Sequence, residues 1–272
     1  MKRIVLFLIL SSCIPVFSIA GGEYKTIGSR ASALGYTSVS LTDNWSVFNN
    51  QAGLAYLNSS SAGIYYENRF LIKELALSAA NFSMPFKSGG VAITFSRFGF
   101  KLWNENKIGL SVARKFGQYL AVGAQLDYLL IHQDENYKNL NFITFEAGML
   151  IRFSDKVSLG IHTYNPLNVR ISANSDERSA ATFRIGPSYK ASEKFLIICE
   201  VRKSTNEDPV FSAGAEYKVL KSFFLRTGIS TNPSLWSFGA GINLGNLNID
   251  VSASDHYILG FSPQIAITYD FM

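Results

Sequence analysis

Cysteine, histidine and proline are scarce in this chain. Its 272 residues include two cysteines, three histidines and seven prolines. Cys13 lies close to the N-terminus, and Cys199 is the one cysteine beyond it, so we expect no intramolecular disulfide. Beyond the N-terminus no stretch offers the ~20 consecutive apolar residues that a membrane helix needs. The sequence therefore excludes a disulfide-stabilised scaffold and a helical membrane protein.

Sequence motifs of common enzymes and metal sites are also missing. There is no Gly-x-Ser-x-Gly, no His-Glu-x-x-His and no phosphate-binding glycine loop. The histidines at 132, 162 and 256 lack metal-ligand spacing. We therefore expect neither a metal ion nor an organic cofactor. The formal net charge of +5 gives no reason to expect nucleic acid as a partner.

One group of residues resembles part of a hydrolase site. Asp255 and His256 are adjacent, and Ser252, Ser254 and Ser262 lie nearby in the sequence. A Ser-His-Asp esterase at the rim of a sheet is the enzymatic interpretation. Neighbouring residues of an extended chain point to opposite faces, so Asp255 is badly placed to orient His256. We expect a polar connection there and no enzyme.

The N-terminus is typical of an export signal. Lys2 and Arg3 precede an apolar stretch, and Ala20 is a small residue of the kind found before a cleavage site. We predict a signal peptide over 1–20, cleaved after Ala20. The alternative is a lipoprotein signal, since Leu-Ser-Ser-Cys ends at Cys13, which would then carry the lipid.

The region 61–272 alternates between apolar and polar residues with the side-chain period of a β-strand. Near the C-terminus Ile265, Ile267, Tyr269 and Phe271 share one face, and polar or small residues occupy the other. An outward apolar face, an inward polar face and aromatic strand ends indicate a transmembrane β-barrel. In lipid such a sheet must close on itself, because every backbone group has to be paired. A soluble β-sandwich is the alternative.

The predicted fold is all-β, an antiparallel transmembrane barrel of about 14 strands, an even number as in bacterial single-chain barrels. The predicted strands cover 61–69, 73–85, 89–98, 105–115, 119–131, 139–153, 156–165, 179–190, 194–203, 209–218, 222–231, 234–244, 246–254 and 260–271. Connections after even strands are short, and most after odd strands are longer, as in 101–106, 132–139, 165–177 and 203–209. This alternation is that of an outer-membrane barrel with both termini in the periplasm.

Residues 21–60 differ in composition from the barrel. They are rich in Gly, Ala, Ser and Asn and show no sustained alternation. Asp43 is expected to cap a short helix that carries Trp45 and Phe48, followed by a turn at 49–53. The segment is too polar to cross lipid, yet its aromatic residues need burial. We predict a plug that folds into the barrel lumen; the alternative is a cap across the mouth.

Charged residues on the inward face form the best candidate site. They are Glu67, Arg69, Asp127, Glu146, Arg152, Arg184, Glu200, Arg202, Glu216, Lys218, Arg226 and Asp250. A selective pore usually carries one sign of charge at its constriction, whereas both signs are present here. We predict ion pairs that brace the wall and hold the plug, because isolated buried charges are too costly to leave unpaired. A conducting or substrate-binding lining is the alternative.

Aromatic residues near the strand ends are predicted to form two girdles at the membrane interfaces. Those expected at the inner interface are Tyr119, Phe153, Tyr217 and Phe271. Those expected at the outer interface are Tyr66, Trp103 and Trp236.

The segment 28–57 resembles the N-terminal region of PorV/PorQ-type outer-membrane proteins, relatives of the FadL transporters that are linked to type IX secretion. The matching residues are Gly28, Arg30, Gly35, Trp45, Phe48, Asn50, Ala52, Gly53, Leu54 and Ala55. Gln51 stands where the family usually has proline. The resemblance covers roughly thirty residues and implies a 14-stranded barrel with an N-terminal lumenal segment.

The family resemblance leads us to expect a non-enzymatic, monomeric barrel that serves protein secretion or surface assembly as an accessory or docking component. Outer-membrane lipid and secretion-machinery or secreted proteins are its expected partners. The alternatives are a FadL-like transporter of a hydrophobic small molecule and a purely structural barrel. Transport would need a lateral opening, and Gly186-Pro187 is the best candidate, since Pro187 removes a donor from the strand ladder.

Overall fold

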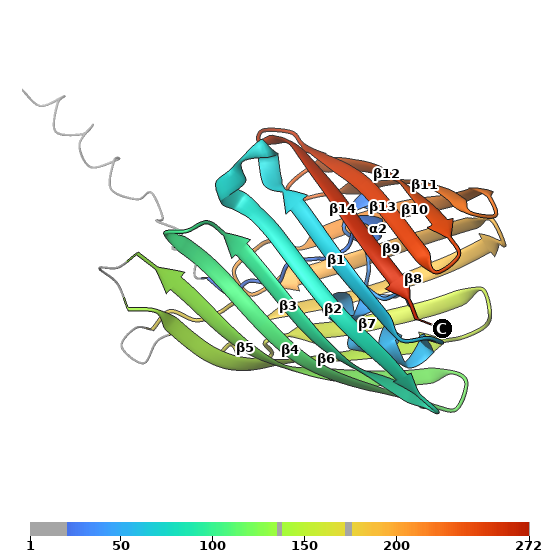
Figure 1. Cartoon of the computed structure of the whole chain (residues 1–272), viewed down its shortest axis with the longest axis horizontal. Coiled ribbons are helices and arrows are strands. Elements are labelled where there is room, and N and C mark those ends of the chain that lie inside the picture. The colour runs from blue at the N-terminus through green and yellow to red at the C-terminus, as the bar shows by residue number, and fades with distance from the viewer. Residues whose placement is uncertain (1–20, 135–137, 172–175, 272) are drawn as a thin grey trace, which may run out of the picture.

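A computed structural model describes residues 21–134, 138–171 and 176–271. The predicted signal peptide and Cys13 lie outside the described residues. In the described residues 14 antiparallel strands form a closed barrel, in which each strand pairs with its sequence neighbours and β1 pairs with β14 (Figure 1). The strands are β1 (Ser61–Asn68), β2 (Ala76–Phe86), β3 (Gly89–Gly99), β4 (Trp103–Phe116), β5 (Leu120–Gln133), β6 (Leu140–Arg152), β7 (Val157–Tyr164), β8 (Thr182–Ser192), β9 (Phe195–Ser204), β10 (Val210–Leu220), β11 (Phe223–Ser230), β12 (Leu235–Leu244), β13 (Leu247–His256) and β14 (Gly260–Asp270).

The structure confirms the predicted fold class and strand order, and it corrects three strand starts. β2 begins at Ala76 rather than at 73, because Lys73–Leu75 form a turn of 3-10 helix, η3. β4 begins at Trp103, so most of the predicted connection 101–106 is strand: its residues pair with the end of β5, as Asn104 does with His132. β8 begins at Thr182 rather than at 179, because Ser179 instead donates a hydrogen bond from its hydroxyl to the carbonyl of Gly22.

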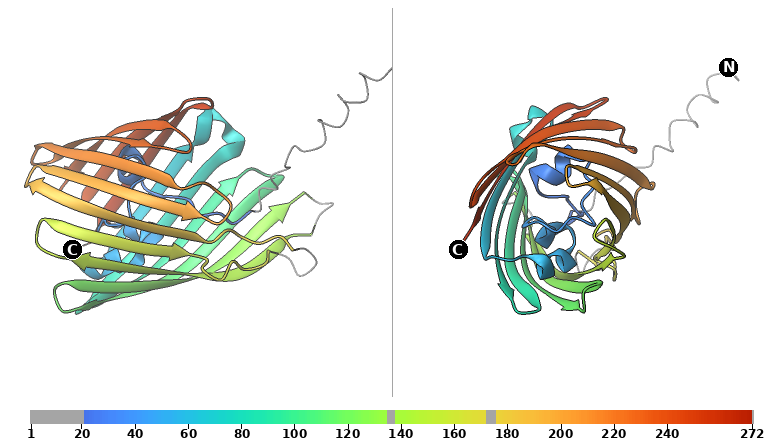
Figure 2. Two further views of the ribbon diagram at one scale, coloured as in Figure 1. Left: turned by 180° about the vertical axis from the view of Figure 1, so that it is seen from behind. Right: turned by 90° about the vertical axis from the view of Figure 1, so that its right-hand side faces the viewer.

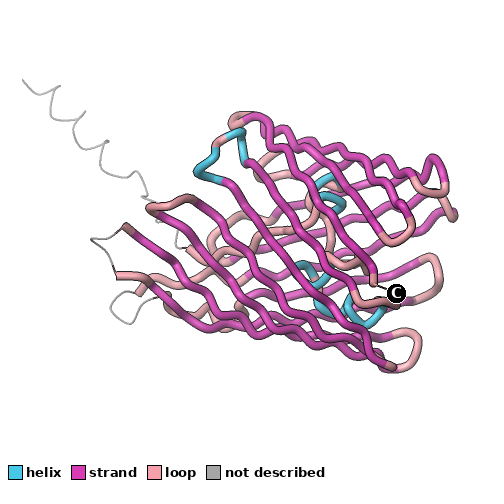
Figure 3. Tube along the Cα trace, viewed as in Figure 1, coloured by secondary structure: helices cyan, strands magenta, loops and turns pink. Residues whose placement is uncertain are grey.

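The connections after the even strands stay short, and those after β1, β5 and β7 are the longest, as the tube in Figure 3 shows. We call the end of the barrel at which β2 joins β3 the short-turn end. The opposite end, where β7 joins β8, is the long-loop end. Positions inside the barrel are given relative to these two ends.

The wall separates apolar from polar side chains as a transmembrane barrel requires. On β5, Leu126 and Tyr128 point outward and are 57% and 44% exposed, whereas Gln125 and Asp127 point inward and are buried. The same alternation runs along the other strands, so the outer surface is a belt of exposed apolar side chains. Closure of the sheet leaves no strand edge unpaired in that belt.

No helix within the described ranges is long and apolar enough to cross a membrane.

The N-terminal segment, residues 21–60, runs down the inside of the barrel (Figure 2, right). It carries two short helices, α2 (Ser29–Ala33) and α3 (Ser46–Asn49), and two turns of 3-10 helix, η1 (Gln51–Tyr56). Gly22 donates its backbone N–H to Glu105 at the long-loop end. Asn44 accepts hydrogen bonds from Ser61 and Ser83 at the short-turn end. The segment therefore extends from one mouth to the other.

Local structure in this segment differs from the prediction in two respects. The expected helix begins at Ser46, and Asp43 instead closes the turn before it by accepting the N–H of Trp45. The expected turn at 49–53 continues as η1, because Asn50 caps it by accepting the N–H of Ala52. The residues at these positions determine the turns. The barrel wall around the segment limits how long each helix can be.

Inward-facing glycines let the segment approach the wall. A Cβ atom added to any of them would meet atoms of the segment at or below ordinary contact distance. They are Gly63, Gly90, Gly123, Gly148, Gly160, Gly186, Gly214, Gly228 and Gly239. At Gly228 the obstructing atoms are the backbone of Leu34 and Gly35, so no change of rotamer could make room. We call this set the glycine belt.

Candidate functional site

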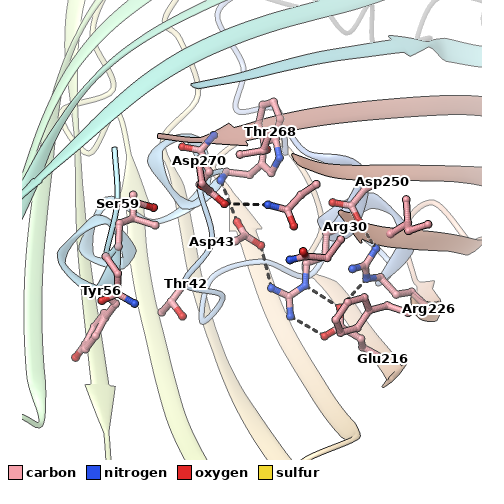
Figure 4. Close-up of a pocket in the computed structure, with 18 residues that line it drawn as sticks. Arg30, Thr42, Asp43, Tyr56, Ser59, Glu216, Arg226, Asp250, Thr268 and Asp270 are labelled. Carbon is pink, nitrogen blue, oxygen red and sulfur yellow. Dashed lines mark hydrogen bonds and ion pairs between the residues drawn. The ribbon is translucent and has the colours of Figure 1, made fainter. Parts of the chain in front are cut away.

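A cavity of about 380 Å³ opens into the lumen at the short-turn end. The N-terminal segment contributes Arg30 and Asp43 to its lining, and the wall contributes Glu216 from β10, Arg226 from β11 and Asp250 from β13 (Figure 4). Strand alternation turns the three wall residues inward, and α2 places Arg30 among them. The site is thus built from both parts of the molecule.

These five side chains form one alternating network of charges. Arg30 donates from Nε and Nη2 to the two oxygens of Glu216, at 2.8 and 2.7 Å, and from Nη1 to Asp43 at 3.1 Å. Arg226 donates to Glu216 at 2.6 Å and to Asp250 at 2.5 Å. Burial opposes the charged form of Arg30, but Glu216 and Asp43 outweigh it and raise its pKa above the ordinary value. Arg30 therefore stays charged and joins the segment to the wall.

A second pair of charges holds the segment halfway along the lumen. Arg184 on β8 donates to both oxygens of Glu200 on β9, at 2.7 and 2.9 Å. Glu200 also accepts the backbone N–H groups of Ser38 and Val39, at 2.9 and 3.0 Å. The other side of the Arg184 guanidinium donates to the carbonyl of Asn49 at 2.6 Å. One ion pair thus binds two separate stretches of the segment.

A third cluster is centred on Glu146 of β6. Its carboxylate pairs with Lys107 at 2.6 Å and with the Nε2 atom of His162 at 3.0 Å. It also accepts a hydrogen bond at 2.8 Å from Gln51, the residue that departs from the family pattern. Asp127 lies next to Lys107, at 3.8 Å. The amide side chain that replaces proline therefore connects the segment to this cluster.

Charge pairs near the long-loop end are fewer and partly exposed. Lys25 of the segment pairs with Glu105 at 2.5 Å. Glu67 pairs with Arg69 at 3.2 Å, and the Tyr36 hydroxyl donates to Glu67 at 3.4 Å. These contacts tie the segment to β4 and β1.

The remaining predicted charges have a different environment. Within the described ranges neither Arg152 nor Arg202 forms an ion pair; Arg152 instead stacks on the ring of Tyr56, at 3.5 Å. The prediction did not include Lys107, although it lies within the predicted strand 105–115. Its position two residues before Gly109, on the polar face of the strand, was the available signal.

The long-loop end also holds an apolar cluster inside the barrel. Its buried members are Leu129, Ile131, Phe142 and Ile171, with Trp103, Leu140 and Val169 packed against them. Trp103 was expected in the outer girdle, but it faces inward and packs edge-on against Phe98. The cluster exists because β5 and β6 carry apolar residues on their inward face near this end, where lumenal residues of a barrel are usually polar.

The start of the N-terminal segment and the β7–β8 connection cover this apolar cluster. A side chain at Gly21 or Gly22 would meet Ile131 or Phe142. The Gly22 carbonyl accepts hydrogen bonds from Tyr164 and Ser179, at 2.7 and 2.8 Å. The cluster is therefore closed by chain segments rather than by the barrel wall.

The residues matched to the PorV/PorQ pattern all lie inside the barrel. They are Gly28, Arg30, Gly35, Trp45, Phe48, Asn50, Ala52, Gly53, Leu54 and Ala55, and except for the half-buried Arg30 they are buried. Trp45, Phe48 and Leu54 share one apolar core with Tyr65 of β1. Asn50 donates to the carbonyls of Val39 and Met149, at 2.6 and 3.1 Å.

The residues considered for an esterase do not assemble into a triad. The Nδ1 atom of His256 accepts the backbone N–H groups of Ile258 and Leu259 in its own turn. Ser262 accepts the N–H of Phe70, and Ser254 bonds to Tyr36. The described part of the chain also holds no group of three His, Cys, Asp or Glu residues that could bind a metal ion.

Comparisons with known proteins show the fold. No family model and no curated protein sequence matches the chain. Among solved structures it is similar to the CymD monoaromatic hydrocarbon channel (TM-score 0.71, 12% identity), with 90% of this chain and 97% of that one covered. It is also similar to the Ralstonia pickettii toluene transporter TbuX (0.68, 10%, covering 92% and 99%) and to a Pseudomonas aeruginosa FadL homologue (0.66, 12%, covering 91% and 99%). These similarities do not point to PorV or PorQ specifically.

Proposed function

We propose that this chain is an outer-membrane β-barrel through which small hydrophobic molecules pass toward the periplasm. The belt of exposed apolar side chains places the barrel in a bilayer. The similar structures that are described as a hydrocarbon channel and a toluene transporter match over nearly their whole length. The long-loop end then faces outward, and the short-turn end faces the periplasm.

The apolar cluster at the long-loop end is the observation that carries this proposal. A barrel that served only as a scaffold, or one that conducted ions, would have polar residues lining its lumen at the long-loop end. Leu129, Ile131 and Phe142 instead form an apolar cluster inside the mouth, beneath the covering chain. A small hydrophobic molecule that displaced the covering chain would leave water and contact these apolar side chains instead. The cluster thus serves as the first binding place on the inward route.

Passage also requires the N-terminal segment to move, because it fills the middle of the lumen. The candidate lateral opening is closed. The β8–β9 ladder lacks paired residues at Gly186 and Pro187, yet the register is the same on both sides, and a Cβ on Gly186 would clash with the carbonyl of Cys199. The strands therefore remain in contact, and movement of the segment is the step that we assign to gating.

We do not retain the docking role as the main function. A partner protein would need an exposed polar surface, but the long connection between β7 and β8 turns Ile171 into the apolar cluster. The first residue of this connection, Asn165, donates to the carbonyl of Ser179 and so folds the connection onto the mouth. We keep the proposals of a monomer in outer-membrane lipid and of a cleaved signal peptide.

Uptake by intact cells tests the proposal. Cells that lack the native gene would receive wild-type protein or a variant, and uptake of a labelled monoaromatic hydrocarbon at low external concentration would be measured. Leu129→Ser with Phe142→Ser should lower uptake several-fold, because the first binding place becomes polar. Leu126→Ala, on the lipid face of the same strand, should leave uptake unchanged. Equal uptake with and without the wild-type protein would rule the proposal out.

A reversible lock tests the movement of the segment separately. A Cβ built on Gly239 lies 2.7 Å from that of Ala33, so Ala33→Cys with Gly239→Cys would need only a small shift to form a disulfide. Cys199→Ser in the same protein prevents mispairing. The oxidised protein should take up little hydrocarbon and should recover after reduction. Full uptake in the oxidised form would show that the segment stays in place during passage.

A further inference from the structure

A second cavity, of about 340 Å³, opens at the short-turn end beside the one in Figure 4, and Arg30 lines both. Its other charged lining residues are Arg152 at the end of β6, Lys156 in the turn to β7, Lys190 on β8, and one acid, Asp155. Strand alternation directs Arg152 and Lys190 into the lumen rather than toward lipid. Positive charge therefore gathers on one side of the short-turn end.

The protein leaves much of this positive charge without a counterion. Arg152 and Lys156 make no ion pair within the described ranges. Stacking on Tyr56 uses the flat face of Arg152 and not its N–H edge. Lys190 pairs with Glu193 at 3.0 Å, but both side chains are exposed, so that pair is weak. In the neighbouring cavity, by contrast, both arginines contact carboxylates.

One residue that lines this cavity, Ser40, has an unpaired hydroxyl. Ser40 lines it and is 5% exposed, and its Oγ atom is buried with no hydrogen-bond partner. Buried polar groups in proteins nearly always have a partner, so this donor calls for an acceptor atom that the protein itself does not supply. Ser154, Ser158 and Ser188 add further hydroxyls to the lining. Cationic groups and hydroxyl donors together suit an oxyanion.

Two leucines also line the cavity. Leu41 of the segment and Leu196 of β9 line it and continue a small core formed with Leu34 and Ile198. A free inorganic ion would gain nothing from this surface, whereas a short hydrocarbon or aromatic group would. The cavity volume lies in the range of about 300–1,000 Å³ that is typical of small-molecule sites.

We propose that this cavity binds a small organic anion. Arg152, Lys156 and the Ser40 hydroxyl would hold its carboxylate, and Leu41 and Leu196 would contact its short apolar body. This site goes beyond the proposed passage of hydrophobic molecules and does not depend on it, because binding can be measured at equilibrium on isolated protein. Failure of hydrocarbon uptake would leave the binding result untouched, and failure of binding would leave the uptake result untouched.

Calorimetric titration of the purified barrel in a non-ionic detergent tests the site. Benzoate is the probe, and benzamide is its neutral counterpart of nearly the same shape. Benzoate should bind, benzamide should bind at least tenfold more weakly, and inorganic phosphate should compete poorly because it lacks the apolar body. Equal binding of benzoate and benzamide would overturn the proposal, and so would phosphate competition as strong as that of benzoate.

Three single substitutions locate the binding. Arg152→Gln and Lys156→Gln should each weaken benzoate binding on the order of tenfold, the usual effect of losing a charge-assisted hydrogen bond. Lys194→Gln, at the same rim but outside the cavity, should change it less than about twofold, because screening reduces the effect of a distant exposed charge. Lys156 is exposed in a turn, so its variant should fold even if the Arg152 variant does not.

Two outcomes would overturn the assignment to this cavity. Equal weakening by Lys194→Gln would indicate general attraction to the rim. Displacement of benzoate by a short-chain phosphatidylglycerol at lower concentration than by hexanoate would assign the charges to lipid headgroups. Displacement by hexanoate at the lower concentration supports the small organic anion. Electrophoretic mobility before and after boiling checks that each variant remains a folded barrel.

Discussion

The two ends of this barrel differ in what fills the interior. At the short-turn end the lumen is polar and hollow, with cavities of about 380 and 340 Å³ lined by charged groups. At the long-loop end the interior includes an apolar cluster, and two cavities there measure about 30 and 40 Å³. One chain segment, residues 21–60, contacts both ends.

This difference shows how one wall supports two kinds of interior. Strand alternation fixes which side chains point inward, but it does not fix their polarity. At the short-turn end many inward residues are charged, and Glu216 pairs with both Arg226 of the wall and Arg30 of the segment. At the long-loop end charged residues such as Glu105 lie beside an apolar cluster that returning chain covers. The charge network around Glu216 depends on ion pairs, and the apolar cluster depends on packing.

The largest expected effect is the loss of one charge at the polar end. Arg226→Met should lower the free energy of unfolding by about 3–5 kcal/mol, because Asp250 keeps a buried charge without its partner. Unfolding by urea in lipid vesicles, followed by tryptophan fluorescence, measures it. The double variant with Asp250→Asn should recover part of the loss. A loss below about 1 kcal/mol would mean that water, rather than Arg226, solvates Asp250.

A packing change at the apolar end should have a somewhat smaller effect. Phe142→Ala should cost about 3 kcal/mol, the lower part of the usual range, since the side chain lies near the mouth. Phe145→Ala, which faces lipid on the same strand, is the matched control and should cost less. The same urea titration applies. Equal costs for the two variants would show that the cluster around Phe142 is not packed more tightly than the lipid face.

A substitution in the glycine belt should affect both ends of the barrel, because the N-terminal segment contacts both. The valine side chain of Gly228→Val would collide with the backbone of Leu34 and Gly35, and such overpacking costs about 1–3 kcal/mol. We expect the segment to leave the wall, so that trypsin cuts at Lys25 or Arg30 and conductance in a planar bilayer rises. Ile229→Val, on the opposite face, should change neither. Unchanged protection from trypsin would mean that the barrel expands instead.

The smallest expected effect is a pH dependence at the long-loop end. Burial raises the pKa of Glu23 above 4.5, with Lys25 opposing the shift. A raised pKa in an acid means that the folded state binds its proton more tightly, so this contribution to stability is present at low pH and is lost as the pH rises above 4.5. Glu23→Gln should therefore be slightly more stable than wild type at neutral pH and no more stable in acid. Identical pH profiles for both proteins would contradict this.

Much of the barrel could be predicted, because the alternation of side chains along a strand and the length of a turn both depend on neighbouring residues in the sequence. The strand containing Leu126 and Gln125 shows its two faces in the sequence itself. The start of β4 at Trp103 could not be predicted in the same way, since Asn104 is a residue typical of connections. Pairing with the long β5 makes it part of the strand, and that pairing is a tertiary effect.

The charges could be predicted to point inward, but their partners could not. Arg30 and Glu216 are separated by 186 residues, and the path of the segment brings them together. The position of α2 depends on the same path, because Gly214 and Gly228 leave room for Leu34 beside the wall. Glycine on the inward face of so many strands was the available signal. It indicated close approach by another part of the chain.

Enclosure of the segment has a consequence for how the protein assembles. Gly35 donates its N–H to Ser237, 202 residues later, and the amide of Gln264 reaches Tyr36 across 228 residues. The wall is completed only when the last strand joins the first. The helix α2 contacts residues of the four last strands, β11 to β14. A finished cylinder cannot admit two helices through its side. We therefore expect the N-terminal segment to be in place before β14 joins β1, so that the last strands form around the part of the chain that is made first.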